Sequence, residues 1–151
     1  MTYKLNKGAV IINHEHMEKG EALEKIINLV CEVYKLQDVD EICKLIIERE
    51  SKLSTGIGLG IAVPHCRIHS ITRIIIGALM LPEGIDYNSV DGQPVRLILL
   101  IISPFDDISG HLACLSSVSH AVSDEETRLK LLKSPSSEEL YENIVRSLKN
   151  Q

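Results

Sequence analysis

The sequence predicts an α/β fold with a central mixed β-sheet of about five strands, flanked by helices on both faces. Two segments, residues 71–81 and 95–102, are continuous β-branched and aliphatic runs of strand length, as expected for strands that are buried on both sides. Segments with a helical period precede and follow them. Because 151 residues, 44% of them hydrophobic, suffice for one core and no linker interrupts them, residues 1–151 are expected to form a single domain.

Two amphipathic helices are predicted in the first third of the chain. Residues 20–36 carry apolar side chains at the helical spacing of about 3.6 residues. A second helix is predicted over residues 40–50, with Asp38 or Asp40 as its N-terminal cap. The side chains expected to face the core are Leu23, Ile26, Ile27, Val30, Val33 and Tyr34 in the first helix, and Ile42, Leu45, Ile46 and Ile47 in the second.

Glycine and proline mark the boundaries in the middle of the chain. Residues 53–60 carry glycine at alternate positions and are expected to form a loop rather than a helix. Residues 61–63 are predicted to be a short strand that ends at Pro64, because proline lacks the amide hydrogen that a central strand uses. A proline also follows each of the two long strands. The connection between those strands, residues 82–92, is rich in turn residues and is expected to be exposed.

The last third of the chain is predicted to be helical. One helix starts near His111, after residues 107–110, and a short helix runs from residues 123–126 to about Lys133. Residues 134–139 resemble a capping box that opens the final helix. The side chains expected on buried helix faces are Leu112, Leu115, Val118 and Val122, and then Leu140, Ile144 and Leu148.

Composition excludes several functional classes. A net charge of −5, 3% aromatic residues and no cluster of Lys and Arg argue against binding to nucleic acid, whose phosphates require concentrated positive charge. No apolar run approaches the roughly 20 residues of a spanning helix, and the N-terminus lacks a signal-peptide stretch, so a cytoplasmic protein without direct membrane insertion is expected. The four cysteines are widely spaced and predict free thiols rather than a disulfide framework.

Two histidines stand out as candidates for chemistry. His65 follows Pro64 at the end of a predicted strand, and α/β proteins commonly place their sites at such sheet edges. His111 lies near a predicted helix start, where free amides and the helix dipole favour a nearby anion. The glycines before His65 follow the pattern G-x-G-x-G and precede a strand, so they match neither the dinucleotide fingerprint nor a P-loop. On their own they indicate a tight loop with positive φ angles. His14 and His16 are expected to be solvated.

Longer motifs carry a resemblance that covers nearly the whole chain. Arg49-Glu50, followed by Ser54-Thr-Gly-Ile-Gly-Leu-Gly-Ile-Ala-Val-Pro-His65, is similar to the active-site signature of the fructose/mannitol-type (type 2) enzyme IIA domains of the bacterial phosphoenolpyruvate-dependent sugar phosphotransferase system. Val90-Asp-Gly-Gln-Pro-Val95 and His111-Leu-x-x-Leu115 resemble the fructose and nitrogen-regulatory branches more than the mannitol branch. One departure is Cys66, where those branches often have glycine.

The resemblance implies a phosphohistidine carrier that needs no cofactor. The histidine matching His65 takes a phosphoryl group from the histidine-containing phosphocarrier protein HPr, which is possible because a neutral imidazole is nucleophilic. It then passes the phosphoryl group to a IIB domain during fructose-type sugar uptake. Arg49 is expected to bind phosphate oxygens, and His111 to hydrogen-bond to the phosphoryl group. The loop donors expected to face the phosphate are Thr55, Gly56, Gly58 and Gly60. The exposed apolar side chains expected to dock donor and acceptor are Ile57, Leu59 and Phe105.

Two other functions are compatible with the same residues. In the nitrogen-regulatory alternative, phosphorylation of His65 switches binding to regulatory target proteins instead of supplying transport, and the sequence does not separate the two. In the more remote alternative, the chain binds a metal through zinc-type ligands. The ligands of that site are His65, Cys66, His69 and His111.

Overall fold

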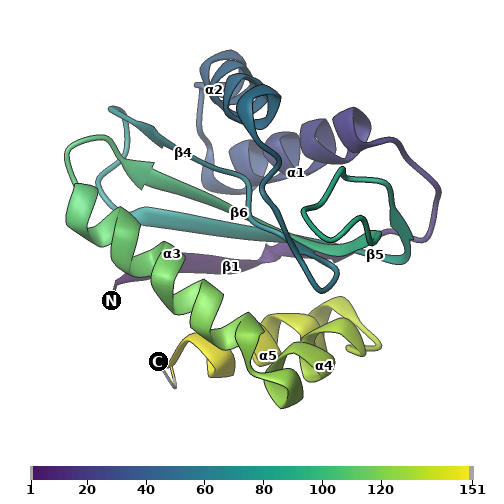
Figure 1. The fold of residues 1–151 in the computed structure, drawn as a ribbon. Coiled ribbons are helices and arrows are strands. Elements are labelled where there is room, and N and C mark those ends of the chain that lie inside the picture. Colours follow the sequence, from purple (N-terminus) through teal and green to yellow (C-terminus); the bar gives the residue numbers. More distant parts are fainter. Residues whose placement is uncertain (1, 150–151) are drawn as a thin grey trace.

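The computed structural model describes residues 2–149 as a mixed sheet between two layers of helices (Figure 1). In chain order the elements are β1 (Tyr3–Ile12), α1 (Lys19–Tyr34), α2 (Val39–Lys52), β2 (Gly56–Gly58), β3 (Ile61–Ala62), β4 (His65–Ile68), β5 (Ile74–Ile85), β6 (Val95–Pro104), α3 (Ile108–Ser123), α4 (Glu125–Leu132) and α5 (Ser137–Lys149). No helix in this range is both long and apolar enough to cross a membrane.

The sheet has six strands where about five were expected. Its order is β1-β5-β6-β3-β2, and β4 pairs with β6 beyond the end of β3. The pair β5/β6 is antiparallel, whereas β1/β5, β3/β6 and β4/β6 are parallel, so the predicted mixed sheet is confirmed. Strands β3 and β4 follow one another along the same side of β6, but β2 lies outside β3, so of these two strands only β4 is at a sheet edge.

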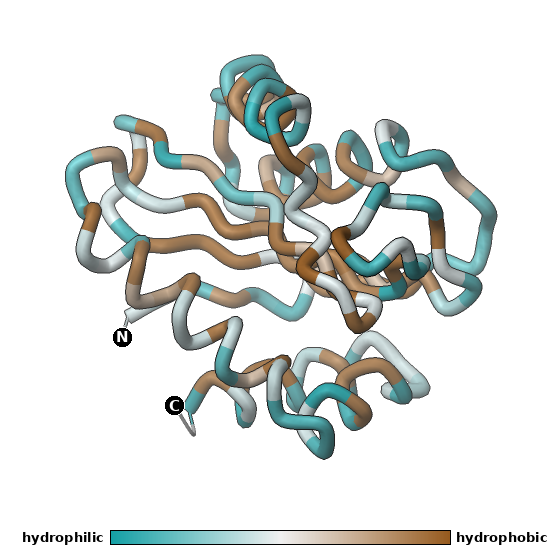
Figure 2. The backbone as a smooth tube through the Cα atoms, viewed as in Figure 1, coloured by the Kyte–Doolittle hydropathy of each residue, from teal (hydrophilic) through white to brown (hydrophobic). Residues whose placement is uncertain are grey.

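The two long aliphatic strands form the centre of the molecule. Both β5 and β6 are buried on their two faces over most of their length, as their continuous apolar runs predict. Helices α1 and α2 cover one face of the sheet, and α3, α4 and α5 cover the other (Figure 1). Figure 2 shows the hydrophobic residues concentrated along these central strands. Each layer of helices therefore encloses its own core against a shared sheet.

The segment after β5 differs most from its prediction. Strand β5 continues through Pro82 to Ile85 instead of ending before the proline. The proline is tolerated because the pairing of β5 with β6 is irregular between Met80 and Ile85, where no regular ladder needs its missing amide hydrogen. The connection that follows is not wholly exposed, since Tyr87 is fully buried and Ser89 is buried as well. The prediction of an exposed connection over residues 82–92 was therefore wrong at these buried positions, whereas residues 90–92 are exposed as expected.

Smaller corrections concern helix faces and caps. Ile47 and Leu112, which were expected to face the core, are both exposed. Helix α3 begins at Ile108, so His111 lies within its first turn rather than at its start. Asp38 precedes α2 but makes no capping hydrogen bond, because its carboxylate accepts a hydrogen bond from the Ser70 hydroxyl.

Candidate functional site

His65 lies directly after a short break in the parallel pairing along β6. Strand β3 ends at Ala62, Pro64 follows, and β4 resumes the parallel pairing at His65, opposite Ile101 of β6. Because side chains alternate along a strand, His65 and Arg67 face the α3 side of the sheet, whereas Cys66 is buried in the core under α1 and α2. His65 is half-buried and keeps part of its ring accessible.

The backbone determines which nitrogen of His65 is available. Nδ1 lies 2.7 Å from the carbonyl oxygen of Val63. A carbonyl can only accept a hydrogen bond, so Nδ1 carries the proton. In the neutral ring, Nε2 therefore holds the lone pair. The strand break thus presents a nucleophilic nitrogen in a fixed orientation.

His111 lies beside His65, as the motif predicted. The two ring centroids are 5.4 Å apart and the ring planes are tilted by 51°. His111 is only 8% exposed, and its Nδ1 is 2.7 Å from Oγ of Ser103. Burial lowers the pKa of His111 below its ordinary value of 6.5, and the neighbouring His65 and Arg67 lower it further, against a smaller opposing effect of Asp107. At neutral pH His111 is therefore uncharged.

Arg67 is the cation that the sequence analysis missed. Its guanidinium donates a hydrogen bond of 2.7 Å to the Phe105 carbonyl oxygen and lies 5.0 Å from the centroid of the Phe105 ring. The His69 ring stacks on the same phenyl ring at 4.0 Å. These contacts hold a permanent positive charge on the His65 side of β4. The available signal was the two-residue spacing from His65, which places both side chains on one face of a strand.

Arg49 lies in the last turn of α2, and its side chain bonds to a residue close to it in sequence. Its guanidinium donates a hydrogen bond of 2.6 Å to the carbonyl oxygen of Leu53, just beyond the helix end. Within residues 2–149 it makes no direct contact with His65. The segment after Arg49 does reach the site, because the Thr55 carbonyl accepts a hydrogen bond of 3.0 Å from the amide of Val63.

A buried polar network holds that segment. The Glu50 carboxylate, whose side chain is 6% exposed, accepts hydrogen bonds from the Thr55 hydroxyl and amide and from the Tyr87 hydroxyl, and pairs with Lys19 at 2.9 Å. Burial raises the pKa of Glu50, but the hydrogen bonds from Thr55 and Lys19 and the charge of Lys19 outweigh it and hold the pKa below its ordinary value. The Thr55 hydroxyl proton is thus directed to Glu50 rather than to the surface.

The glycine loop is a tight hairpin between β2 and β3, as its composition indicated. Gly58, Leu59 and Gly60 have φ angles of 92°, 60° and 84°, a run that glycine tolerates best. Gly56 has a different reason to lack a side chain, because a Cβ there would lie 2.3 Å from Oγ of Ser89.

Two amides of this hairpin already have acceptors within the chain. The amide of Gly56 donates to the Ser54 hydroxyl at 3.0 Å, and that of Leu59 donates to the Asp91 carboxylate at 2.9 Å. A phosphate at this loop would compete with both contacts. The geometry of the hairpin therefore explains why glycine occupies these positions, and a bound anion is not needed to explain it.

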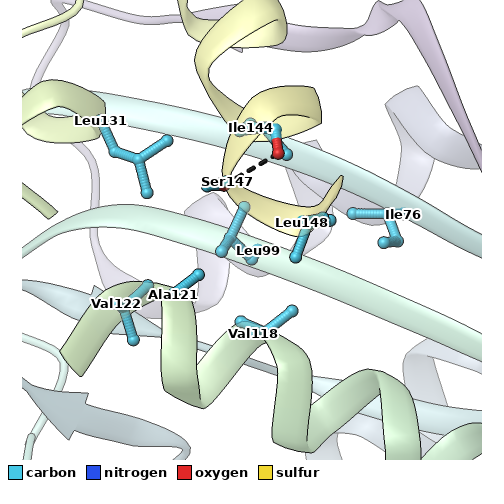
Figure 3. Close-up of a pocket in the computed structure, with 9 residues that line it drawn as sticks. All are labelled: Ile76, Leu99, Val118, Ala121, Val122, Leu131, Ile144, Ser147 and Leu148. Carbon is cyan, nitrogen blue, oxygen red and sulfur yellow. Dashed lines mark hydrogen bonds between the residues drawn. The ribbon is translucent and has the colours of Figure 1, made fainter. Parts of the chain in front are cut away.

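One enclosed cavity lies away from His65, in the core beneath the helices. The cavity in Figure 3 lies inside the core of α3, α4, α5 and the sheet, has a volume of about 10 Å³ and is lined almost entirely by aliphatic side chains. It is too small and too apolar for a substrate. Several apolar side chains are nevertheless exposed, as is common for surfaces that contact another protein. Phe105 contacts Arg67 on the His65 side of β4, Ile108 and Leu112 lie in the first turns of α3 beside His111, and the predicted Ile57 and Leu59 lie in the β2–β3 hairpin.

The alternative of a metal site finds no support in the described residues. Cys66 points to the opposite core from His65, and His69 stacks on Phe105. Among residues 2–149, no group of three or more His, Cys, Asp or Glu side chains could hold a metal ion. All four cysteines are free.

Comparisons with known proteins find the same family and the same fold. Residues 4–147 match the family model of the phosphoenolpyruvate-dependent sugar phosphotransferase system, EIIA 2. The chain is 33% identical to the fructose-specific EIIABC component of Bacillus subtilis over 95% of its own length, but spans only 23% of that relative. It is 32% identical to the nitrogen regulatory protein of Pseudomonas aeruginosa, covering 93% of this chain and 92% of the relative. The crystal structure of nitrogen regulatory protein IIA-Ntr from Neisseria meningitidis superposes with a TM-score of 0.80 at 25% identity, covering 90% of this chain and 93% of that one.

Proposed function

Because this chain belongs to the EIIA 2 family of the phosphoenolpyruvate-dependent sugar phosphotransferase system, we propose that it is a phosphohistidine carrier acting at His65. The phosphoryl group comes from the phosphocarrier protein HPr and passes to a IIB domain. The chain acts in the cytoplasm as a single domain. The observation that carries the proposal is the hydrogen bond from Nδ1 of His65 to the Val63 carbonyl, which leaves Nε2 as the nucleophile.

The transfer requires little chemistry from the protein. The lone pair on Nε2 of His65 attacks the phosphorus of the donor's phosphohistidine; the new N–P bond forms as the donor's N–P bond breaks, and the donor imidazole keeps the electron pair. Such a reaction depends on alignment and on stabilisation of the phosphoryl charge. Arg67 supplies a positive charge close to His111, and the imidazole ring of His111 lies beside that of His65. The exposed apolar side chains of Ile57, Leu59 and Phe105 are proposed to contact each partner in turn.

The test is direct phosphorylation. The purified chain is incubated with labelled phosphoenolpyruvate, enzyme I and HPr, and phosphate bound to the protein is measured at neutral and acid pH. One acid-labile phosphate per chain supports the proposal. Absence of labelling while HPr itself is labelled would reject it.

Arg49 is proposed to contribute a planar two-point contact to the phosphoryl group when a partner is docked. Only one of its five N–H donors is occupied by Leu53, so others remain for the phosphate. Arg49→Lys is expected to slow transfer from HPr about tenfold although the charge is kept, because an ammonium group cannot form the paired contact. Single-turnover labelling measures this rate, and Arg146→Lys on the exposed face of α5 is the matched control. Equal rates in both variants would show that Arg49 only caps α2.

A regulatory role is the second candidate, and the similarity to nitrogen regulatory proteins over nearly their whole length favours it. A transport carrier should bind its partners transiently, whereas a regulator should hold a target in one phosphorylation state. We expect the two roles to separate in capture experiments with His65→Ala and with the charge mimic His65→Asp, combined with growth of a deletion strain on fructose. A stable partner of one variant with normal growth indicates regulation. Loss of growth without a stable partner indicates transport.

A further inference from the structure

A buried serine lies behind the second histidine of the site. Ser103 occupies the end of β6, opposite Arg67 of β4, and its side chain is completely buried. It follows the aliphatic run of residues 97–102, so a hydroxyl at this position breaks the pattern of the strand. Its Oγ is 2.7 Å from Nδ1 of His111. Because a buried hydroxyl is costly unless it is hydrogen-bonded, this contact restrains both groups.

The direction of that hydrogen bond determines what His111 presents to the site. Since His111 is buried and close to Arg67, its ring is neutral and carries one N–H. The Val63 carbonyl at His65 can only accept, but a serine hydroxyl can either donate or accept. If Ser103 accepted, Nε2 of His111 would carry a lone pair, which repels phosphoryl oxygens. If Ser103 donates, Nε2 carries the proton and becomes a hydrogen-bond donor.

We propose that the Ser103 hydroxyl donates a hydrogen bond to the unprotonated Nδ1 of His111 and so holds His111 in the Nε2–H tautomer, opposite to the Nδ1–H tautomer of His65. One imidazole is then prepared to attack phosphorus, and the other to donate a hydrogen bond to the transferred group. Ser103 is a positioning residue that acts through His111. The direction of the hydrogen bond and its effect on transfer both rest on the proposed function, but the tautomer is measured without any phosphoryl transfer.

Nitrogen NMR of the histidine side chains tests the tautomer in the unmodified protein. At pH about 8, above the usual range of histidine pKa values, the His111 signals are expected to show a protonated Nε2 and an unprotonated Nδ1. His65 is expected to show the reverse pattern. A protonated Nδ1 in neutral His111 would overturn the proposal, and this measurement needs no variant to fold.

Variants then test the consequence for transfer. Ser103→Ala is expected to slow phosphorylation of His65 about tenfold, the loss expected from one hydrogen bond, and to mix the two His111 tautomers. Ser103→Thr keeps the hydroxyl and suits a strand, so it should restore the single tautomer and much of the rate. Ser147→Ala is the matched control, because Ser147 is also buried and donates to a carbonyl, but lies in α5.

The outcomes separate this inference from the proposed function. If Ser103→Ala and Ser147→Ala share the wild-type rate and the wild-type His111 spectrum, Ser103 has no positioning role. If neither the wild-type protein nor the variants take up phosphate, the proposed function fails. The nitrogen NMR spectrum of His111 still decides which tautomer is present.

Discussion

Replacing His65 by alanine is expected to abolish phosphorylation by phosphoenolpyruvate, enzyme I and HPr. The imidazole provides the attacking lone pair, and no neighbouring group can replace it, since His111 is nearly buried and Cys66 faces the opposite core. Loss of a nucleophile that acts covalently reduces rates by several orders of magnitude, so labelling should fall to background, at least about 1,000-fold below wild type. Acid-labile label on the intact protein, followed by peptide mapping, measures this.

Two further histidine variants make the result specific. His111→Ala should still be labelled, but more slowly, because His111 assists the transfer without forming the bond. His120→Ala should be labelled at the wild-type rate, since its exposed side chain lies in the last turn of α3, away from the reacting pair. Equal labelling of His65→Ala and wild type would place the acceptor elsewhere and end the proposal.

The architecture could be predicted because its strongest signals are local. The aliphatic runs of β5 and β6 and the periodic faces of α1 and α5 are visible in any short window of sequence. Strand β1 was missed because its pattern is not regular. Its first half is largely exposed and only its second half holds fully buried residues, with a register shift against β5 between Leu5 and Val10. Such an edge strand shows no clean alternation of apolar and polar residues.

The site was predictable in part for the same reason. His65 and His111 belong to compact motifs, and the structure brings their rings together. Arg67 and Ser103 were missed for different reasons. Arg67 had a local signal in its two-residue spacing from His65, but its position near His111 depends on the pairing of β4 with β6, which joins segments separated by some 36 residues. Ser103 was missed because its contact with His111 forms only when α3 packs back onto the end of β6. The Glu50 network was missed likewise, since its partners come from α1, the loop before β2 and the loop after β5.

Glu50 is expected to be the most costly polar side chain to remove. In Glu50→Ala, the Lys19 ammonium, the Tyr87 hydroxyl and the Thr55 amide lose their shared acceptor in a largely buried environment. Breaking a buried ion pair costs about 3–5 kcal/mol, and partial exposure of Lys19 reduces the expected loss to about 2–3 kcal/mol. A loss of that size lowers the melting temperature of a domain of this length by about 5–10 °C. Urea and thermal unfolding measure it.

The control is Glu142→Ala, whose carboxylate forms an exposed pair with Arg146 and should cost less than about 0.5 kcal/mol. The two variants would have equal stability if the buried network contributed nothing.

The dependence of stability on acid pH provides an independent check. Because the pKa of Glu50 is lowered on folding, its contribution is complete above its ordinary value of 4.5 and is lost as the pH falls through the folded pKa. The stability gap between wild type and Glu50→Gln should therefore narrow below about pH 4.5.

The same variant connects stability to transfer. Glu50 holds Thr55, the Thr55 carbonyl pairs with the amide of Val63, and the Val63 carbonyl orients His65. Loosening the first contact should let the His65 ring leave its fixed orientation, so Glu50→Gln is expected to slow phosphorylation even at temperatures where it is fully folded. The expected loss is about tenfold, comparable to one misplaced hydrogen bond. If folded Glu50→Gln is labelled as fast as Glu142→Gln, the network stabilises the domain without orienting its nucleophile.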